Sequence, residues 1–159
     1  MPRVILRLIL LLVAVNVAQV QADFFGPSRD VESVSVEELQ ALMAGKGPQG
    51  KIVLVDVRSP GEIAVSMIPG AISRSEFEAS RDQYRGTEVI TYCTVGARSA
   101  DYAEKLLDDG FQARNYAGSI LDWVGAGLSL VTPDGEPTRR VHVYSKRFSV
   151  PPPYEAVTQ

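Results

Sequence analysis

The only cysteine of the chain, Cys93, stands between two segments of different character. The apolar run EVITY (88–92) precedes it and has the length and composition of a buried strand. The segment RSADYAEKLLDDG (98–110) follows, with apolar residues at helical spacing and a glycine at its end. Cys93 is therefore expected at the carboxyl end of a strand, just before a helix.

This position suits a nucleophilic thiol. Amides at the start of a helix, together with the helix dipole, form an anion site. The same field favours the thiolate and lowers the pKa of a cysteine to about 3.5–7.5 in known cases. Gly96 permits a positive φ angle and the close approach of an anion to the backbone. The predicted substrate-binding loop consists of Thr94, Val95, Gly96, Ala97, Arg98 and Ser99.

The side chains of this loop allow more than one role. Arg98 is predicted either to contact an anionic substrate or to pair with an acidic residue. Thr94 and Ser99 offer hydroxyls, and Ser99 is a candidate N-cap. The alternative for Cys93 is a small buried apolar residue that closes the strand, as most lone cysteines are. Its place at a strand-to-helix junction favours the functional thiol.

Strand-like and helix-like segments alternate along the chain. Strands are predicted at 52–56, 88–92 and 111–118, with a short one near Ile72. Helices are predicted at 36–45, from Pro60 onward, at 75–84, at 98–110 and at 119–127. This alternation predicts an α/β fold, a doubly wound and mostly parallel sheet with helices on both faces. Ligands of such sheets bind beyond the carboxyl ends of the strands.

The first residues resemble a secretory signal peptide. Arg3 and Arg7 precede an apolar run (8–15), and small residues suit cleavage after Ala22. The alternative is a retained membrane anchor, but a spanning helix needs about 20 apolar residues, and polar residues interrupt this run from Asn16. The mature protein is predicted to be periplasmic or secreted, without membrane association.

The predicted signal peptide (1–22) is followed by a polar lead-in segment (23–34), one domain (35–131) and a C-terminal extension (132–159). In the extension we expect a turn, an edge strand near 141–144 and a polyproline-like tail.

Charge and cysteine count restrict the partners. Loss of two arginines with the signal peptide leaves 14 basic and 19 acidic residues, a formal charge of −5. This balance disfavours nucleic acid as a partner. An oxidising compartment favours disulfides, yet Cys93 has no partner in its own chain. The thiol must be free, capped or bound to another molecule.

Three motifs in one order resemble those of a known family. They are Asp56-Val57-Arg58, Ile68-Pro69-Gly70-Ala71 and the segment CTVGARS (93–99). Together they resemble a single-domain rhodanese, a thiosulfate-type sulfurtransferase, over roughly residues 34–131. Each motif alone is weak, but three in register on an alternating β/α pattern make the match specific.

The resemblance implies a rhodanese domain in which Cys93 takes a sulfane sulfur from a small donor and becomes a persulfide. The amides from Thr94 to Arg98 would hold the terminal sulfur as an anion, and a thiol or cyanide acceptor would then remove it. Neither a metal nor an organic cofactor is implied. Relatives that act as phosphatases or arsenate reductases resemble this fold but have a loop one residue longer than CTVGAR (93–98), so sulfur is favoured over phosphate.

The chain also departs from the family pattern. Ser66-Met67 stands where rhodanese domains often have a histidine, and Ile63 stands where they often have an aromatic residue. Both differences concern the rim of the site and its substrate preference.

Other residues are open to a structural interpretation. Asp56 and Arg58 could line the pocket but are favoured as a polar pair that stabilises the fold. Glu62 is interpreted as a helix cap. His142, the single histidine, lies outside the resemblance, so no cysteine–histidine pair is inferred.

Two other functions fit the same sequence. One is a sulfur-carrying module with negligible turnover, whose acidic surface and PPPY tail (151–154) bind another exported protein. The other is a redox-sensing thiol that forms sulfenic acid or a mixed disulfide. The sequence does not identify the sulfur donor, the acceptor or the oligomeric state.

Overall fold

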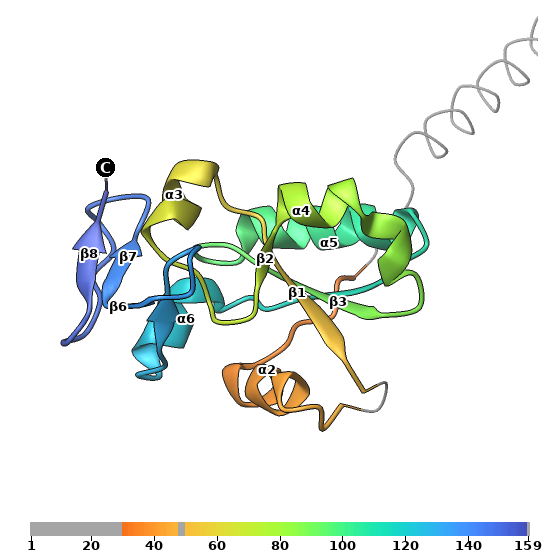
Figure 1. Ribbon diagram of the computed structural model, residues 1–159, viewed down its shortest axis with the longest axis horizontal. Helices are drawn as coiled ribbons and strands as arrows, with labels where there is room; N and C mark the ends of the chain where they lie inside the picture. The colour runs from red at the N-terminus through yellow and green to blue at the C-terminus, as the bar shows by residue number, and fades with distance from the viewer. Residues whose placement is uncertain (1–29, 48–49, 159) are drawn as a thin grey trace, which may run out of the picture.

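The computed structural model describes residues 30–47 and 50–158, so the predicted signal peptide (1–22) lies outside the described residues. Four parallel strands form the central sheet in the order β2-β1-β3-β4 (Figure 1). Within the described stretches, no helix has the length and apolar character needed to cross a membrane.

The helices are α2 (Val36–Met43), α3 (Pro60–Val65), α4 (Arg74–Ala79), the 3-10 helix η1 (Arg81–Tyr84), α5 (Ala97–Asp108) and α6 (Ser119–Gly125). The strands are β1 (Ile52–Asp56), β2 (Ile72–Ser73), β3 (Glu88–Tyr92), β4 (Gln112–Asn115), β5 (Leu130–Val131), β6 (Pro137–Thr138), β7 (Arg140–His142) and β8 (Glu155–Val157).

Helices cover both faces of the sheet, which confirms the predicted α/β class. In Figure 1, α4 and α5 lie above the sheet while α2 and α6 lie below it. Successive residues of a strand point to opposite faces, so β1 and β3 supply two hydrophobic cores. Leu54 and Ile90 belong to the core with α2 and α6. Val55 and Val89 belong to the core with α4 and α5, and this second core also contains Cys93.

The predicted helix starts are confirmed in part. Ser59 and Glu62 form a capping box at the start of α3, as the spacing predicts. The helix predicted at 75–84 is instead α4 followed by η1, and the N-cap of α4 is Ser73. The Ser73 hydroxyl accepts the Glu76 N–H while the Glu76 carboxylate accepts the Ser73 N–H, so the capping box lies before the predicted start of this helix.

The described part of the lead-in segment, residues 30–34, pairs with the central sheet. The Val34 N–H donates to the carbonyl of Asn115 at 2.9 Å, and the Asn115 N–H donates to the carbonyl of Glu32 at 2.9 Å. The lead-in therefore extends the sheet beyond β4. The side chain of Val34 is buried in the core on the α2 side.

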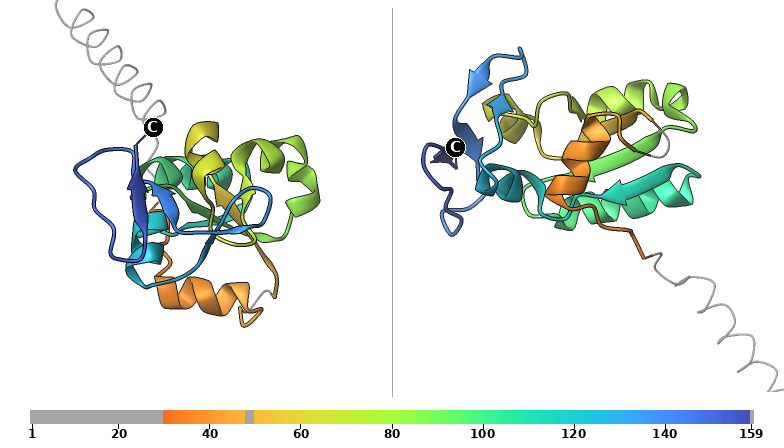
Figure 2. Two further views of the ribbon diagram at one scale, coloured as in Figure 1. Left: turned by 60° about the vertical axis from the view of Figure 1, so that its left-hand side comes forward. Right: turned by 90° about the horizontal axis from the view of Figure 1, so that it is seen from below.

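The C-terminal extension packs on the domain beside α3, at the end of the sheet where the parallel strands finish (Figure 2). Strand β7 pairs in parallel with β8, so the prediction of a polyproline-like tail is wrong for residues 155–157. The strand predicted near 141–144 lies at 140–142, because Tyr144 adopts a positive φ of 61° that a strand does not accommodate. Val141 and Val143 are fully buried, which fixes the extension to the core.

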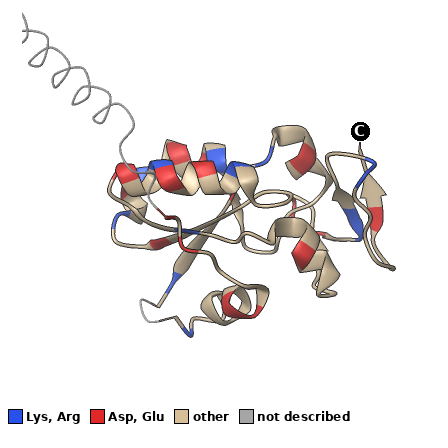
Figure 3. Ribbon diagram, turned by 180° about the vertical axis from the view of Figure 1, so that it is seen from behind, with Lys and Arg blue, Asp and Glu red and all other residues tan. Residues whose placement is uncertain are grey.

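Charged residues of both signs occur along α5, whereas those of α2 are all acidic. In Figure 3 the ribbon of α5 shows acidic and basic positions interspersed rather than separated. The helix contains Arg98 and Lys105 beside Asp101, Glu104 and Asp108. The charge of α5 is therefore mixed along its length rather than gathered into a patch of one sign.

Candidate active site

Cys93 follows β3 directly and is buried, with 1% of its surface exposed. It lines a cavity of about 220 Å³. The thiol therefore lies between the core and a cavity, rather than in a sealed apolar interior. The cavity is lined by Cys93, Thr94, Val95, Ala97, Arg98, Tyr144 and Phe148.

Backbone amides surround the sulfur of Cys93. The Gly96 N–H donates to the sulfur at 3.1 Å, and the Ser119 hydroxyl lies 3.9 Å from it. Burial raises the pKa of the Cys93 thiol, but hydrogen bonds from Ser99 and from the amides of Val95 and Gly96 outweigh it and lower the pKa overall. The loop thus favours the thiolate, which is the nucleophilic form.

Gly96 gives the loop its shape. Its φ is +93°, and a Cβ at this position would lie 2.2 Å from the carbonyl oxygen of Ala117. The carbonyl of Gly96 accepts hydrogen bonds from the Asn115 amide at 3.1 Å, the Ser99 hydroxyl at 3.1 Å and the Ala100 N–H at 3.0 Å. These donors fix the peptide unit that follows Gly96, while the N–H of Gly96, in the preceding peptide unit, donates to the thiol. Ser99 therefore lies inside α5, and Gly96 occupies the N-cap position for which Ser99 was a candidate.

Arg98 forms an ion pair with Glu62. Its two terminal nitrogens donate to the two carboxylate oxygens, each at 2.8 Å, and one of them also donates to the Thr94 hydroxyl at 3.0 Å. Burial raises the pKa of the Glu62 carboxyl, but Arg98 and the Ser59 cap outweigh it and hold the pKa well below its usual range. Of the two predicted roles of Arg98, the structure shows the pairing with an acid.

Glu62 is therefore more than the helix cap that the sequence suggested. It accepts the Ser59 N–H at 3.0 Å and the Thr94 hydroxyl at 3.0 Å, in addition to its pairing with Arg98. This one carboxylate joins the start of α3 to the start of α5. The sequence separation of 36 residues between Glu62 and Arg98 explains why local spacing did not reveal the pair.

Asp56 and Arg58 form a separate, fully buried ion pair. Arg58 donates to the two Asp56 oxygens and, at 2.6 Å, to the carbonyl of Ser66. The Tyr92 hydroxyl donates to Asp56 at 2.5 Å. These contacts tie the end of β1 to β3 and to the turn before β2, as expected for a polar pair that stabilises the fold.

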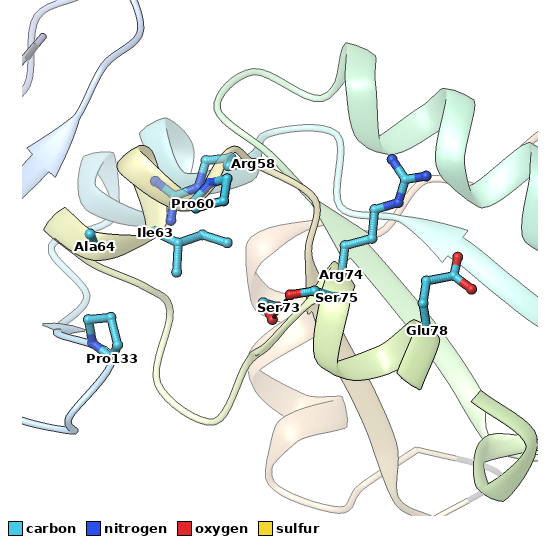
Figure 4. Close-up of a pocket in the computed structure, with 9 residues that line it drawn as sticks. All are labelled: Arg58, Pro60, Ile63, Ala64, Ser73, Arg74, Ser75, Glu78 and Pro133. Carbon is cyan, nitrogen blue, oxygen red and sulfur yellow. Dashed lines mark hydrogen bonds between the residues drawn. The ribbon is translucent and has the colours of Figure 1, made fainter. Parts of the chain in front are cut away.

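Arg58 lines a different cavity from Cys93. A cavity of about 440 Å³ lies between α3 and the start of α4, and the residues around it are drawn in Figure 4. Ile63 and Ala64 from α3 face Arg74 and Glu78 from α4 there. Cys93 is not among the residues that line this space, so the larger cavity is not the thiol site.

Sequence reasoning missed three residues near the thiol, Ser119, Tyr144 and Phe148. Ser119 accepts the Cys93 N–H at 3.0 Å, although its sequence context suggested only a helix start. Tyr144 and Phe148 reach the cavity from the C-terminal extension, which the motifs do not cover. His142 lies with its Nδ1 3.9 Å from Glu62 rather than against the sulfur, and the same nitrogen accepts the Tyr144 N–H at 3.1 Å. None of these has a local sequence signal that identifies it.

The described side chains do not suggest a metal site. Within residues 30–47 and 50–158, no three or more His, Cys, Asp or Glu side chains are grouped so that they could hold a metal ion. The site instead contains the thiol of Cys93, backbone amides directed at its sulfur, and Arg98 paired with Glu62.

Comparison with known proteins assigns this arrangement to a family. The rhodanese-like domain family matches residues 35–126, which include the Cys93 loop and both ion pairs. The chain belongs to the rhodanese-like domain family. The cysteine loop at the end of the central strand is thus the loop of a rhodanese-like domain.

Two relatives of the chain are named sulfurtransferases. The sulfurtransferase of Allochromatium vinosum is 37% identical over 94 residues, which cover 53% of this chain and 82% of that protein. The thiosulfate:glutathione sulfurtransferase of Homo sapiens is 27% identical over 110 residues, which cover 58% of this chain and 92% of that protein. These relatives support a function of the sulfurtransferase type for this rhodanese-like chain.

A solved structure shows the same fold. The crystal structure of a thiosulfate sulfurtransferase from Pseudomonas aeruginosa superposes with a TM-score of 0.55 and 27% identity. The match covers 67% of this chain but only 21% of that one, so this chain corresponds to about a fifth of the Pseudomonas protein.

Proposed function

We propose that this rhodanese-like protein is a sulfurtransferase in which Cys93 is the nucleophile and becomes a persulfide. The observation that supports the proposal most directly is the short contact of 3.1 Å between the Gly96 N–H and the sulfur, at a thiol whose pKa is lowered and which lines a cavity. A thiol that only filled the core would need neither the amides nor the cavity.

The first half-reaction begins with the thiolate. Cys93 attacks the sulfane sulfur of a thiosulfate-like donor, a new sulfur–sulfur bond forms, and the bond to the sulfonate sulfur breaks. The electron pair of the broken bond leaves with sulfite, and the enzyme retains a persulfide anion. The loop amides stabilise this terminal sulfur, because N–H dipoles at the start of α5 point toward negative charge.

The second half-reaction regenerates the enzyme. A thiolate or cyanide acceptor attacks the outer sulfur of the persulfide, the sulfur–sulfur bond breaks, and Cys93 leaves as a thiolate. The lowered pKa of Cys93 favours both halves, since it increases the ionised fraction in the first and improves the leaving group in the second.

In this proposal the backbone amides stabilise the anion, and the guanidinium of Arg98, which also interacts with the Cys93 sulfur, adds to them. The arginine donates to both oxygens of Glu62 as well. This pair would fix the start of α3 against the start of α5 and keep one wall of the cavity in place.

The test is a mass measurement combined with an assay. Mature protein incubated with thiosulfate should gain the mass of one sulfur atom, and addition of cyanide should release thiocyanate over many turnovers. The absence of both products would contradict the proposal. A gain of sulfur without turnover would indicate the sulfur-carrying module instead, and faster reaction with peroxide than with thiosulfate would indicate the redox sensor.

We also propose that the protein is exported to the periplasm or secreted. The support for this is the pattern of residues 1–22, with Arg3 and Arg7 before an apolar run and a small-residue cleavage site after it. Fusion of these residues to a reporter active only outside the cytoplasm should give signal and a processed product. An unprocessed, inactive fusion would contradict export.

A further inference from the structure

The C-terminal extension contributes two aromatic residues to the cavity of Cys93. Tyr144 and Phe148 line it, and both lie beyond residue 126, where the match to the rhodanese-like family ends. The Cys93 loop and Arg98 supply the rest of the lining. The wall opposite the reactive loop is therefore made by a segment that is additional to the family domain.

The extension is held firmly enough to act as a wall. Val141 and Val143 are fully buried, and the hydroxyl of Tyr154 donates to the carbonyl of Leu128 at 2.7 Å. Phe148 packs against the same hydrophobic core as these two valines. Strands β7 and β8, seen beside α3 and α6 in Figure 2, join the ends of the segment.

Tyr144 is fixed in place yet exposed. Its N–H donates to Nδ1 of His142 at 3.1 Å, and its ring centre lies 5.5 Å from the guanidinium carbon of Arg98. Its exposed fraction is 68%, and that of Val95, which lines the same cavity, is 47%. Among the described residues the other exposed large hydrophobic side chain is Met43. Exposed apolar side chains are thus concentrated at this cavity, which is typical of a ligand-binding surface.

The charge at the cavity is small. Arg98 is the only cationic residue among those lining the cavity, and both of its terminal nitrogens donate to Glu62. The remaining lining beyond Cys93 is Thr94, Val95, Ala97 and the two aromatic rings. A ligand that enters the cavity meets mainly apolar surface, together with one arginine that is paired with Glu62.

We propose that the C-terminal extension makes this enzyme selective for acceptor thiols attached to an apolar body, in preference to charged thiols such as glutathione. The inference rests on the proposed function, since it concerns the second half-reaction. The acceptor thiolate attacks the outer sulfur of the Cys93 persulfide, forming its own persulfide and releasing the Cys93 thiolate. The apolar body lies against Tyr144 and Phe148, where its burial is favourable.

The experiment measures transfer from the loaded enzyme. The protein is loaded with thiosulfate, loading is confirmed by intact mass, and excess donor is removed. Loss of the persulfide is then timed with benzyl mercaptan and with glutathione, at concentrations adjusted to equal thiolate. The unaltered protein is expected to transfer faster to benzyl mercaptan.

Variants of Tyr144 test whether the C-terminal extension causes the preference for benzyl mercaptan over glutathione. Tyr144→Ala should reduce the ratio of the two rates by roughly three- to tenfold, the loss expected for one aromatic contact. Tyr144→Phe should retain the ratio because it keeps the ring. Met43→Ala, an exposed apolar residue away from the cavity, should leave the ratio unchanged.

Two outcomes would overturn the inference. Only the second would also contradict the proposed sulfurtransferase function. Equal rates for the two thiols, or a ratio that Tyr144→Ala does not change, would contradict the role of the extension while leaving the sulfurtransferase proposal intact. A Cys93 that does not load with thiosulfate would overturn the proposed function and this inference together.

Discussion

The cavity of Cys93 has two walls, the loop at residues 93–98 and the C-terminal extension. The loop contributes mainly backbone groups, and the extension contributes side chains. The loop at residues 93–98 presents backbone amides to the sulfur, and its shape depends on the absence of a side chain at Gly96. The C-terminal extension presents the rings of Tyr144 and Phe148 to the cavity. Reactivity is therefore expected to depend on main-chain geometry, and acceptor preference on side chains. Substitutions on the two walls should separate the two properties.

The largest effect should come from the thiol itself. Cys93→Ser removes the nucleophilic sulfur, so both the gain of mass with thiosulfate and the formation of thiocyanate should disappear. The fold should persist, because serine is close in size to cysteine, and thermal unfolding provides that check. Persulfide formation by this variant would show that another group in the protein does the chemistry.

Gly96→Ala should break the loop while leaving the aromatic wall in place. The added Cβ would lie 2.2 Å from the Ala117 carbonyl oxygen in a backbone with φ of +93°. Strain of about 1–3 kcal/mol is expected at such a position, which corresponds to a roughly 5- to 160-fold loss if the amides turn away from the sulfur. The measurement is the rate of loading with thiosulfate.

Gly61→Ala is the matched control for this change. Gly61 lies in α3, and a Cβ there would meet nothing within 4 Å. Loading should stay near that of the unaltered protein. If Gly96→Ala loads as fast as Gly61→Ala, the amide cradle is not needed for reactivity and the contrast between the two walls fails.

The dependence of loading on pH tests the thiolate. Because the folded protein lowers the pKa of Cys93, the thiol should remain ionised at a pH where a free cysteine is protonated. The loading rate should be flat above this pKa and should fall about tenfold per pH unit below it. The midpoint should lie below about 8.5, the value of an unperturbed cysteine. A midpoint at or above that value would argue against the electrostatic role of the loop.

Glu62→Gln should have a smaller effect, because it weakens the contact between the start of α3 and the start of α5. It removes the negative charge that compensates Arg98, whose ring partner is Tyr144. Since the side chain of Arg98 is 40% exposed, the loss of unfolding free energy should be only about 1–2 kcal/mol. The released charge should also shift acceptor preference toward glutathione, measured by the same transfer rates.

Asp82→Asn is the control for Glu62→Gln. Asp82 pairs with Arg85 at 3.7 Å, and its side chain is 92% exposed. Such pairs contribute little to stability, so this variant should leave the unfolding midpoint and the acceptor preference unchanged. An equal effect of the two variants would show that the Glu62 pair has no special part in the site.

The sequence by itself determined the elements whose signals are local. The apolar runs of β1 and β3 and the capping box at Ser59 each depend on neighbours within a few residues, and the structure contains them as predicted. The place of Cys93 after a strand and before a helix follows from the same local patterns. These features are fixed by hydrophobic periodicity and capping, which can be recognised without knowing the fold.

Only the tertiary structure decided what surrounds the thiol. Glu62 meets Arg98 across 36 residues, and Ser119 reaches the Cys93 N–H across 26. Tyr144 reaches the cavity from the C-terminal extension, which lies outside the three family motifs. None of these pairings follows from spacing along the chain, because each arises where separate elements end at the same edge of the sheet. Their positions are set by the packing of α3, α5, α6 and the extension around the central strands.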